Sequence, residues 1–461
     1  MKSHRFASFS RPSCSMRSLT AALTLLSAGT ASADSLSDRL SFSMYGRVGV
    51  AWAPTSGDYI QGRSLNLTGN SLGGRLEEGD YLEPTLRIHL LKPTAEELAV
   101  DKDAPYANAV ITPAMWANNG LFIALTSNRG AQTLTFELGE AYLEAGNILA
   151  PGLKFWAGAR YYRGTNVYLA DTFYFNNLSS QGVGVQYGGL DVAVLLQTSI
   201  NGSQYNFDSN GDGVLDIRRQ RSLLVGQYKQ QFGSGHYAQV LGELHALPET
   251  KARLPSDTTV LPSDLGWVAG IKGYLNLGND SFNELSVRYG SRIANGGSAG
   301  SQSWVTFGAP AANGKYGNAR SLEVVEHILY NVNPLLSLNG YGILHLGQGA
   351  SGAATDKFMD FSVGAQSTLY LHKNFHLMNE ASFQGVRDGS DPLNTATKLS
   401  LVPTLVPTGQ SSPFARPHLR LFYTIAFYNQ QAVDKLHSPY LQTVGASSIG
   451  HFLGARVEWW I

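Results

Sequence analysis

The sequence predicts an all-β fold, a transmembrane antiparallel β-barrel, and three observations support this prediction. Several segments alternate polar and apolar residues with a period of two. The N-terminus has the pattern of an export signal. The composition combines 50 Gly, 22 Tyr and 20 Phe with only 15% charged residues, whereas about a quarter of a soluble chain is charged. Outer-membrane barrels need many turns, aromatic girdles and an apolar outer band.

Residues 1–33 have the three regions of a secretory signal peptide. The basic first region contains Lys2, Arg5, Arg11 and Arg17. The apolar region is Leu19–Ser27, and Ala31-Ser-Ala33 fits the small-residue rule for cleavage. A transmembrane anchor is the alternative, but it needs about 20 apolar residues, roughly twice the number present. We therefore expect cleavage after Ala33 and a single barrel domain over residues 34–461.

Cysteine content and charge narrow the function classes. Cys14 precedes the apolar region and leaves with the signal, so the mature chain has no disulfide or thiol chemistry. Cleavage also removes four of the 34 basic residues and no acid, which leaves a net charge of about −4. This balance argues against a nucleic-acid surface. After the signal no apolar run reaches about 18 residues, so helical membrane spans are excluded.

The period-two alternation is clearest near the two chain ends. In residues 41–52 the odd positions are polar or small and the even positions are mostly apolar. Residues 81–90, 416–428 and 454–461 repeat the pattern. A soluble β-sandwich alternates in the same way, but the export signal and the aromatic residues of the last segment favour a barrel.

Polar stretches rich in Gly, Ser, Asn and Asp separate the alternating segments. The longest lie at 200–216, 291–320 and 346–357, and we expect them to be long extracellular loops. No linker divides the chain. At about 24 residues for each strand with its turn, the chain has room for about 16 to 18 strands.

Several short motifs occur in order along the chain. They are Tyr45-Gly-Arg47, Arg75-Leu76, Tyr81-Leu-Glu83, Phe155-Trp-Ala-Gly-Ala-Arg-Tyr-Tyr-Arg163, Asp171-Thr-Phe-Tyr-Phe175, Phe282-Asn283, Phe414-Ala-Arg-Pro417 and Gly454-Ala followed by Glu458-Trp-Trp460. With these motifs the sequence resembles the maltoporin family of sugar-specific porins. The motifs occur in the family's order along the whole length of the chain, and it is the ordered set that is specific, not any single motif.

The resemblance implies an outer-membrane barrel of about 18 strands, the upper estimate, with 16 as the alternative. It also implies that the barrel is usually trimeric and that its third loop folds inward. It implies facilitated diffusion of oligosaccharides, without a cofactor, along a row of aromatic rings called the aromatic slide. By resemblance the slide residues are Tyr45, Tyr81, Phe282, Phe414 and Trp460. The polar track and constriction would contain Arg47, Arg75, Glu83, Arg163, Asp171 and Phe173.

The physical basis of such a slide is general. The apolar face of a sugar ring can stack on an aromatic ring, while its hydroxyls need polar groups that replace lost water. Weak sites in series let the solute both enter and leave. The alternation supports the assignment, because the slide positions share a face with charged residues, as Tyr45 does with Arg47 and Trp460 with Glu458. The alternatives are that these rings belong to the aromatic girdles at the membrane interfaces, and that the charged residues are those that line the lumen of any porin.

The sequence departs from the family pattern at four places. The constriction tyrosine of the family is Phe173 here, and the constriction arginine falls at Gly164, with Arg163 its nearest substitute. Another track arginine falls at Gly139. The sixth slide aromatic, which a neighbouring subunit donates in the family, has only Trp116 as a loose candidate. We therefore expect a wider or less polar constriction, and the sugar remains open.

A possible structural calcium site occurs in one polar stretch. Its oxygen ligands would be Asp208, Asn210, Asp212 and Asp216. The twelfth position is Arg219 in place of the usual bidentate glutamate, so a solvated turn is the alternative.

Two other functions remain as alternatives to a sugar channel. A general, non-specific porin would carry an ion current that sugars do not block. An outer-membrane enzyme barrel is the second alternative, but the G-x-S-x-G matches at residues 69–73 and 296–300 are expected by chance among 50 glycines. The expected partners are outer-membrane lipid, an oligosaccharide and two further copies of the chain.

Overall fold

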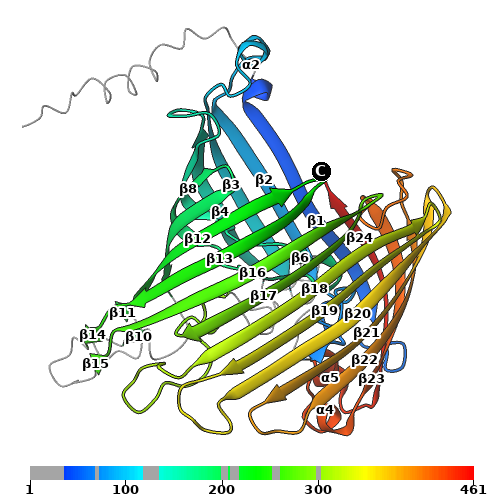
Figure 1. Cartoon of the computed structure of the whole chain (residues 1–461). Helices are drawn as coiled ribbons and strands as arrows, with labels where there is room; N and C mark the ends of the chain where they lie inside the picture. Colours follow the sequence, from blue (N-terminus) through cyan, green and yellow to red (C-terminus); the bar gives the residue numbers. More distant parts are fainter. Residues whose placement is uncertain are drawn as a thin grey trace, which may run out of the picture.

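The computed structural model describes residues 36–67, 72–117, 134–198, 206–207, 217–251, 260–296 and 303–461. Within these residues the main element is an 18-stranded antiparallel sheet, which closes on itself as a barrel (Figure 1). The fold class and the larger of the two expected strand counts are therefore confirmed. The expected signal peptide and the four candidate calcium ligands lie outside the described residues.

The wall strands follow one another around the barrel in chain order. They are β1 (Leu40–Trp52), β2 (Asp80–Leu91), β3 (Tyr106–Ala117), β4 (Leu134–Gly146), β5 (Lys154–Arg160), β8 (Ser180–Tyr187), β9 (Leu190–Thr198), β12 (Gln220–Phe232), β13 (His236–Leu247), β16 (Asp264–Gly278), β17 (Ser281–Arg292), β18 (Arg320–Asn333), β19 (Leu336–Gln348), β20 (Lys357–His372), β21 (Phe375–Asp388), β22 (Asn394–Leu405), β23 (His418–Tyr428) and β24 (Ile449–Trp460).

Shorter elements lie in the connections. They are η1 (Leu36–Arg39), α2 (Ala95–Val100), β6 (Asn166–Val167), η3 (Tyr168–Ala170), β7 (Thr172–Phe173), β10 (Asn206–Phe207), β11 (Ile217–Arg218), β14 (Thr250–Lys251), β15 (Val260–Leu261), α4 (Gln430–Asp434) and α5 (Pro439–Val444). No helix in the described part of the chain is long and apolar enough to cross a membrane.

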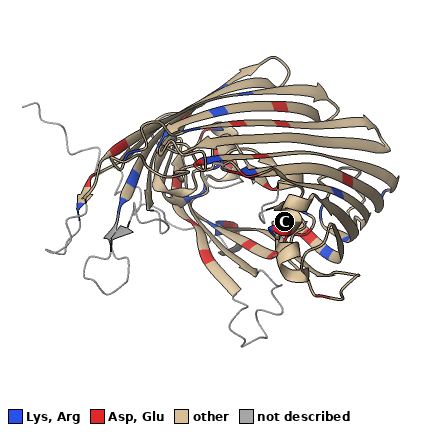
Figure 2. Cartoon of the chain, turned by 90° about the horizontal axis from the view of Figure 1, so that it is seen from below, with Lys and Arg blue, Asp and Glu red and all other residues tan. Residues whose placement is uncertain are grey.

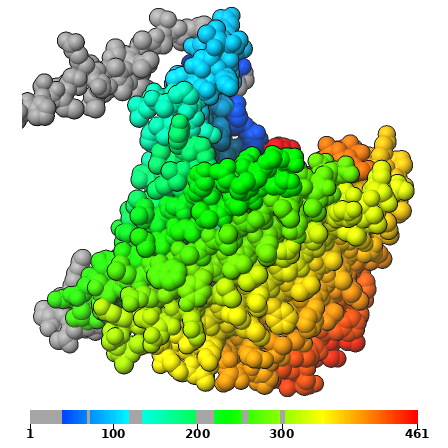
Figure 3. All heavy atoms as spheres, in the orientation of Figure 1, coloured from blue at the N-terminus to red at the C-terminus, as the bar shows by residue number. Residues whose placement is uncertain are grey.

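The first and last strands close the wall. β1 pairs antiparallel with β24, with Tyr45 opposite Trp460 and Trp52 opposite Leu453, and its other edge pairs with β2. Closure matters because hydrocarbon offers no hydrogen-bond partner to an unpaired backbone group. In the space-filling view the side chains of the green to orange strands form one continuous outer surface (Figure 3).

The two ends of the barrel differ in the length of their connections. At one end most strands are joined by short turns, such as residues 279–280 and 334–335, although the connections 92–105 and 406–417 at this end are longer. At the other end long connections dominate, including residues 53–79, 161–179 and 429–448, the last with α4 and α5 (Figure 1). Outer-membrane barrels have short periplasmic turns and long extracellular loops, so the long-loop end faces outward.

Wall residues alternate between lipid and lumen as the sequence predicts. In β23, Leu419 and Leu421 are exposed while His418 and Arg420 are buried. The predicted boundary is wrong by two residues, because the strand begins at His418 and not at Arg416. Pro417 has no N–H for the ladder, so it is poorly suited to a wall strand.

Other boundaries also differ from those the sequence predicts. The last strand begins at Ile449, five residues before the expected start. The loops expected at 291–320 and 346–357 are the connections 293–319 and 349–356. The loop boundaries differ because polar residues at strand ends, such as Ser291, Arg320 and Lys357, have the composition of loops.

The first long loop follows β1, and its residues 60–67 and 72–79 lie inside the barrel, whereas residues 54–59 are exposed. Its Leu65 and Leu67 are fully buried. The Leu67 N–H donates to Gln384 Oε1 at 2.9 Å, and the Lys398 ammonium donates to Asn66 Oδ1 at 2.7 Å. Because Gln384 and Lys398 belong to β21 and β22, the loop packs against the inner face of that side of the wall.

The third long loop, residues 161–179, crosses the lumen. The Phe175 N–H donates to Glu323 Oε1 on β18 at 2.8 Å, and the Tyr168 hydroxyl donates to Glu458 on β24 at 2.7 Å. Tyr174 bonds Glu284 on β17. A segment that contacts three distant wall strands narrows the interior, as expected of an inward-folded third loop.

Candidate functional site

A compact cluster of charged residues lies where the first and third long loops meet β1. Seen from the loop end, basic and acidic residues occur together inside the ring of strands (Figure 2). Arg47 contacts Glu78 at 2.9 Å and Asp171 at 3.7 Å. Arg75 contacts Glu78 at 3.1 Å and Asp171 at 3.8 Å. Two cations and two anions therefore form one cluster, which we call the constriction pairs.

Two members of this cluster lie outside the wall strands and have shifted pKa values. Burial alone would raise the pKa of Asp171, but the Arg75 and Arg47 charges outweigh burial and hold it below its usual range. Burial alone would lower the pKa of Arg75, but Asp171 and Glu78 raise it well above its usual value. Both side chains stay ionised at neutral pH.

Glu458 on β24 is the centre of a second, adjoining network. Its side chain is fully buried. One carboxylate oxygen accepts hydrogen bonds from the Tyr45 hydroxyl at 2.9 Å and the Tyr168 hydroxyl at 2.7 Å. The other accepts from His418 at 3.0 Å and from Arg420. Three arginines lie within ion-pair distance of this one carboxylate: Arg75, Arg416 and Arg420.

Three aromatic rings form a row beside the constriction pairs. Tyr45 and Tyr81 have ring centroids 5.9 Å apart, and Tyr81 stacks on Trp116 at 6.4 Å with an interplanar angle of 23°. The three residues come from the adjacent strands β1, β2 and β3, with Tyr81 directly opposite Trp116. Trp116, the loose candidate for the sixth slide aromatic, thus extends the row within one chain.

A second group of rings continues beyond Glu458. Tyr168 lies 6.2 Å from Trp460 and 5.9 Å from Phe414, edge-on to both. The Arg416 guanidinium covers the Trp460 ring at 4.5 Å and the Tyr168 ring at 5.0 Å. Phe414 belongs to the 406–417 connection at the short-turn end, whereas Trp116 is near the long-loop end of β3. The rings therefore follow the channel from outside to inside.

Phe282 lies apart from the other four predicted slide residues. It stacks on Tyr274 at 5.6 Å, and Tyr274 stacks on Tyr237 at 4.9 Å with an interplanar angle of 3°. The Lys229 ammonium lies 3.7 Å from the centre of the Tyr237 ring. These residues lie near the turns 233–235 and 279–280, so Phe282 belongs to an aromatic stack at the short-turn end.

Arg163, Phe173 and Glu83 lie together at the edge of the third loop. The Arg163 guanidinium is sandwiched between the Tyr161 ring, 4.1 Å away, and the Phe173 ring, 4.0 Å away. Glu83 accepts hydrogen bonds from Tyr81 and, at 3.1 Å, from Tyr161. Glu83 is thus hydrogen-bonded to the aromatic row through the hydroxyl of Tyr81, and to the third loop through the hydroxyl of Tyr161.

The two glycines at family arginine positions have different neighbours. A Cβ at Gly139 would overlap the Tyr161 hydroxyl, so Tyr161 occupies the space of a side chain there. A Cβ at Gly164 would lie 2.6 Å from the Tyr174 carbonyl oxygen and 2.6 Å from Asn176 Oδ1. No side chain fits at Gly164 without moving the loop.

Sequence reasoning missed Tyr161 and Tyr168. Both lie in the third loop, outside regular strands, so alternation could not assign them to a face. The one available signal was the Tyr161-Tyr-Arg163 sequence, where aromatic and basic residues are adjacent as they are on the predicted slide. Within the described ranges, no group of three or more His, Cys, Asp or Glu side chains is placed to hold a metal ion.

Comparisons with known proteins give one family and several similar folds. Pseudomonas aeruginosa OccK9 (OpdG) has 11% identity and a TM-score of 0.46, covering 92% of this chain and 99% of that chain. The outer membrane channel DcaP of Acinetobacter baumannii has 10% identity and a TM-score of 0.44, covering 92% and 98%. Salmonella typhi OmpF in complex with daunomycin has 8% identity and a TM-score of 0.41, covering 92% and 97%.

These structural likenesses are loose. The family comparison is decisive, since the model described as LamB porin matches residues 40–460, from the first wall strand to the last. The match thus includes the constriction pairs and all the predicted slide residues. The chain belongs to the LamB porin family and is a β-barrel channel of the bacterial outer membrane.

Proposed function

We propose that this channel passes oligosaccharides across the outer membrane by facilitated diffusion. The observation that carries the proposal is a series of aromatic rings beside paired charges. Trp116, Tyr81 and Tyr45 lie on adjacent strands, with Tyr81 opposite Arg47 of the constriction pairs. Tyr168, Trp460 and Phe414 form a second group toward the short-turn end. Each ring offers an apolar platform to the matching face of a sugar.

The polar groups next to the rings supply the other half of the recognition. Arg47 lies 5.3 Å from the Tyr81 ring centre, and Glu83 accepts from the Tyr81 hydroxyl. A sugar hydroxyl that loses its water can therefore donate to a carboxylate or accept from a guanidinium beside the same aromatic ring. Because cations and anions alternate, the track suits a neutral, polyhydroxylated solute better than an ion of either sign.

The proposed channel has no catalytic step and no cofactor, and we expect it to assemble as a homotrimer, as its resemblance to the sugar-specific porins implies. The slide is not expected to need a neighbouring chain, because Trp116 stacks on Tyr81 of the same chain. Which sugar fits best is the part of the proposal that experiment must decide.

Single-channel recording with maltose, maltotriose, sucrose and cellobiose tests the proposal. We expect at least one sugar series to block the ion current, and longer members to block at lower concentration. Tyr81→Ala and Phe414→Ala should each weaken the block by about 2- to 10-fold, the loss expected for one aromatic contact.

The matched control is Tyr330→Ala, because Tyr330 lies on the outer face of β18 and is 49% exposed. Its removal should leave the block unchanged. A current that no sugar alters would identify a general porin, and an equal loss in all three variants would show that the slide residues have no special role.

A further inference from the structure

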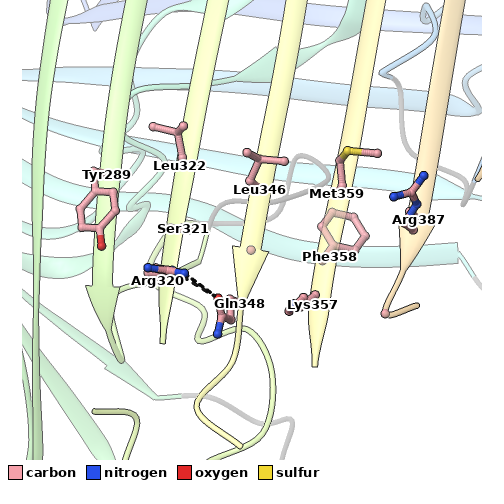
Figure 4. A pocket seen from close by; sticks show the side chains of 12 residues that line it. Tyr289, Arg320, Ser321, Leu322, Leu346, Gln348, Lys357, Phe358, Met359 and Arg387 are labelled. Atoms are coloured by element: carbon pink, nitrogen blue, oxygen red, sulfur yellow. Dashed lines mark hydrogen bonds between the residues drawn. The ribbon is translucent and has the colours of Figure 1, made fainter. Parts of the chain in front are cut away.

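A shallow pocket lies on the outer face of the barrel wall, away from the channel. It is formed near the long-loop ends of β17 to β21 (Figure 4). The three basic residues around it are Arg320, Lys357 and Arg387, and all three are exposed. Basic side chains on the lipid-facing surface are costly toward the bilayer midplane, but the cost falls to about zero near the interface.

The strand register places the pocket residues in two rows. In the row nearer the loops, Arg320 is opposite Gln348, and Gln348 is opposite Lys357. Neighbouring strands lie about 4.8 Å apart, so the two cations flank one strand. The Arg320 Nε and Nη2 atoms both donate to Gln348 Oε1, at 3.2 and 3.1 Å. This contact orients the guanidinium without neutralising it.

The second row lies two residues nearer the midplane and is mostly apolar. Leu322 is opposite Leu346, and Leu346 is opposite Met359. Tyr289 extends the row on one side and Arg387 ends it on the other. Figure 4 shows these side chains above Arg320, Gln348 and Lys357, on the same face of the wall. The pocket thus joins a cationic edge to an apolar floor.

The three basic side chains of this patch are not engaged in ion pairs. Among the described residues, none of the salt bridges involves Arg320, Lys357 or Arg387. Two acids of the same strands, Glu323 and Asp360, contact His345 in the barrel interior, and the exposed Asp388 follows Arg387 on β21. At the same end of the barrel, other strands present apolar side chains outward, such as Leu265, Phe427 and Ile449.

We propose that this patch binds the phosphorylated headgroup of a lipid in the outer leaflet of the outer membrane. The cationic row lies at headgroup level on the outward-facing side, and arginine and lysine bind phosphate strongly. The apolar row lies where the acyl chains of the same lipid begin. A free phosphate would use the cations but not the floor, so the two rows together favour a lipid over a soluble anion.

The patch can be tested by native mass spectrometry of the detergent-solubilised full barrel with lipid A that carries both phosphates. We expect wild-type protein to bind this lipid, and dephosphorylated lipid A to bind far less. The variant Arg320→Gln/Lys357→Gln/Arg387→Gln should bind about 100-fold more weakly, since three cations are lost.

The matched control is Lys92→Gln/Lys154→Gln/Lys373→Gln, which removes three exposed cations at the short-turn end. It should bind lipid A as the wild type does. Unchanged ion conductance of both variants will show that the barrel is intact. Equal binding by both variants, equal binding of the dephosphorylated lipid, or displacement by millimolar inorganic phosphate would each overturn the proposal.

Discussion

Replacing Glu458 with Gln should both destabilise the barrel and change its ion selectivity. The carboxylate is fully buried and lies 3.6 Å from Arg416 and 3.9 Å from Arg75, with Arg420 closer still. At an effective dielectric constant of about 20, two unit charges 4 Å apart interact by about 4 kcal/mol. Loss of one partner from a buried ion pair costs about 3–5 kcal/mol.

The expected loss in free energy of unfolding for Glu458→Gln is therefore about 3–5 kcal/mol. Urea unfolding in lipid vesicles, followed by tryptophan fluorescence, measures it. Because the constriction loses a negative charge, the reversal potential in a salt gradient should shift toward anion permeation. Glu458→Asp separates the two effects, since it keeps the charge but shortens the reach to Tyr45 and Tyr168: selectivity should remain while stability falls.

Glu96→Gln is the control, because Glu96 is an exposed carboxylate on α2, outside the lumen. It should change neither quantity. If Glu458→Gln unfolds at the wild-type urea concentration and has the wild-type reversal potential, the buried network does not have the role assigned to it.

Three further outcomes concern the third loop and the aromatic row. Burial would raise the pKa of Asp171, but Arg75 holds this pKa below its usual range. The contribution of the carboxylate to stability and to cation preference should therefore persist as the pH falls through about 4 and be lost only at lower pH. Asp171→Asn should lack this contribution at every pH, and reversal potentials measured against pH will show whether the two proteins differ. Gly164→Ala places a Cβ 2.6 Å from the Tyr174 carbonyl oxygen, so the loop must shift at a cost of about 1–3 kcal/mol, and an unaltered single-channel conductance would contradict this. Trp116→Ala should slow sugar entry and weaken sugar block by about 2- to 10-fold with no change in reversal potential, as analysis of current fluctuations can measure.

The sequence was sufficient for the wall because the physics of the wall is local. Each strand faces lipid on one side and the lumen on the other, so a period of two appears directly in residues such as Leu419 and Arg420. Strand ends were harder to predict where polar residues occur, as at Arg320 and Lys357. The inward course of the third loop came from family resemblance, since nothing local in residues 161–179 encodes it.

The lumen was harder to predict because its contents depend on contacts between distant parts of the chain. The first long loop is held inside by pairs such as Asn66 with Lys398 and Leu67 with Gln384. Tyr168 bonds Glu458, which lies 290 residues further along the chain. Alternation could place Tyr45 and Trp460 on the charged face. It could not show that a residue of the third loop, Tyr168, would lie beside the ring of Trp460.

The pairing of β1 with β24 has a consequence for biogenesis. Until residues 449–460 have met residues 40–52, the sheet has two free edges, and each edge presents unpaired amides that hydrocarbon cannot solvate. A nascent chain that lacks its final segment therefore cannot insert stably into the bilayer, however many other strands have formed. Completion of synthesis and burial in the membrane are thus coupled, and loss of the last dozen residues should be as damaging to assembly as loss of the first strand.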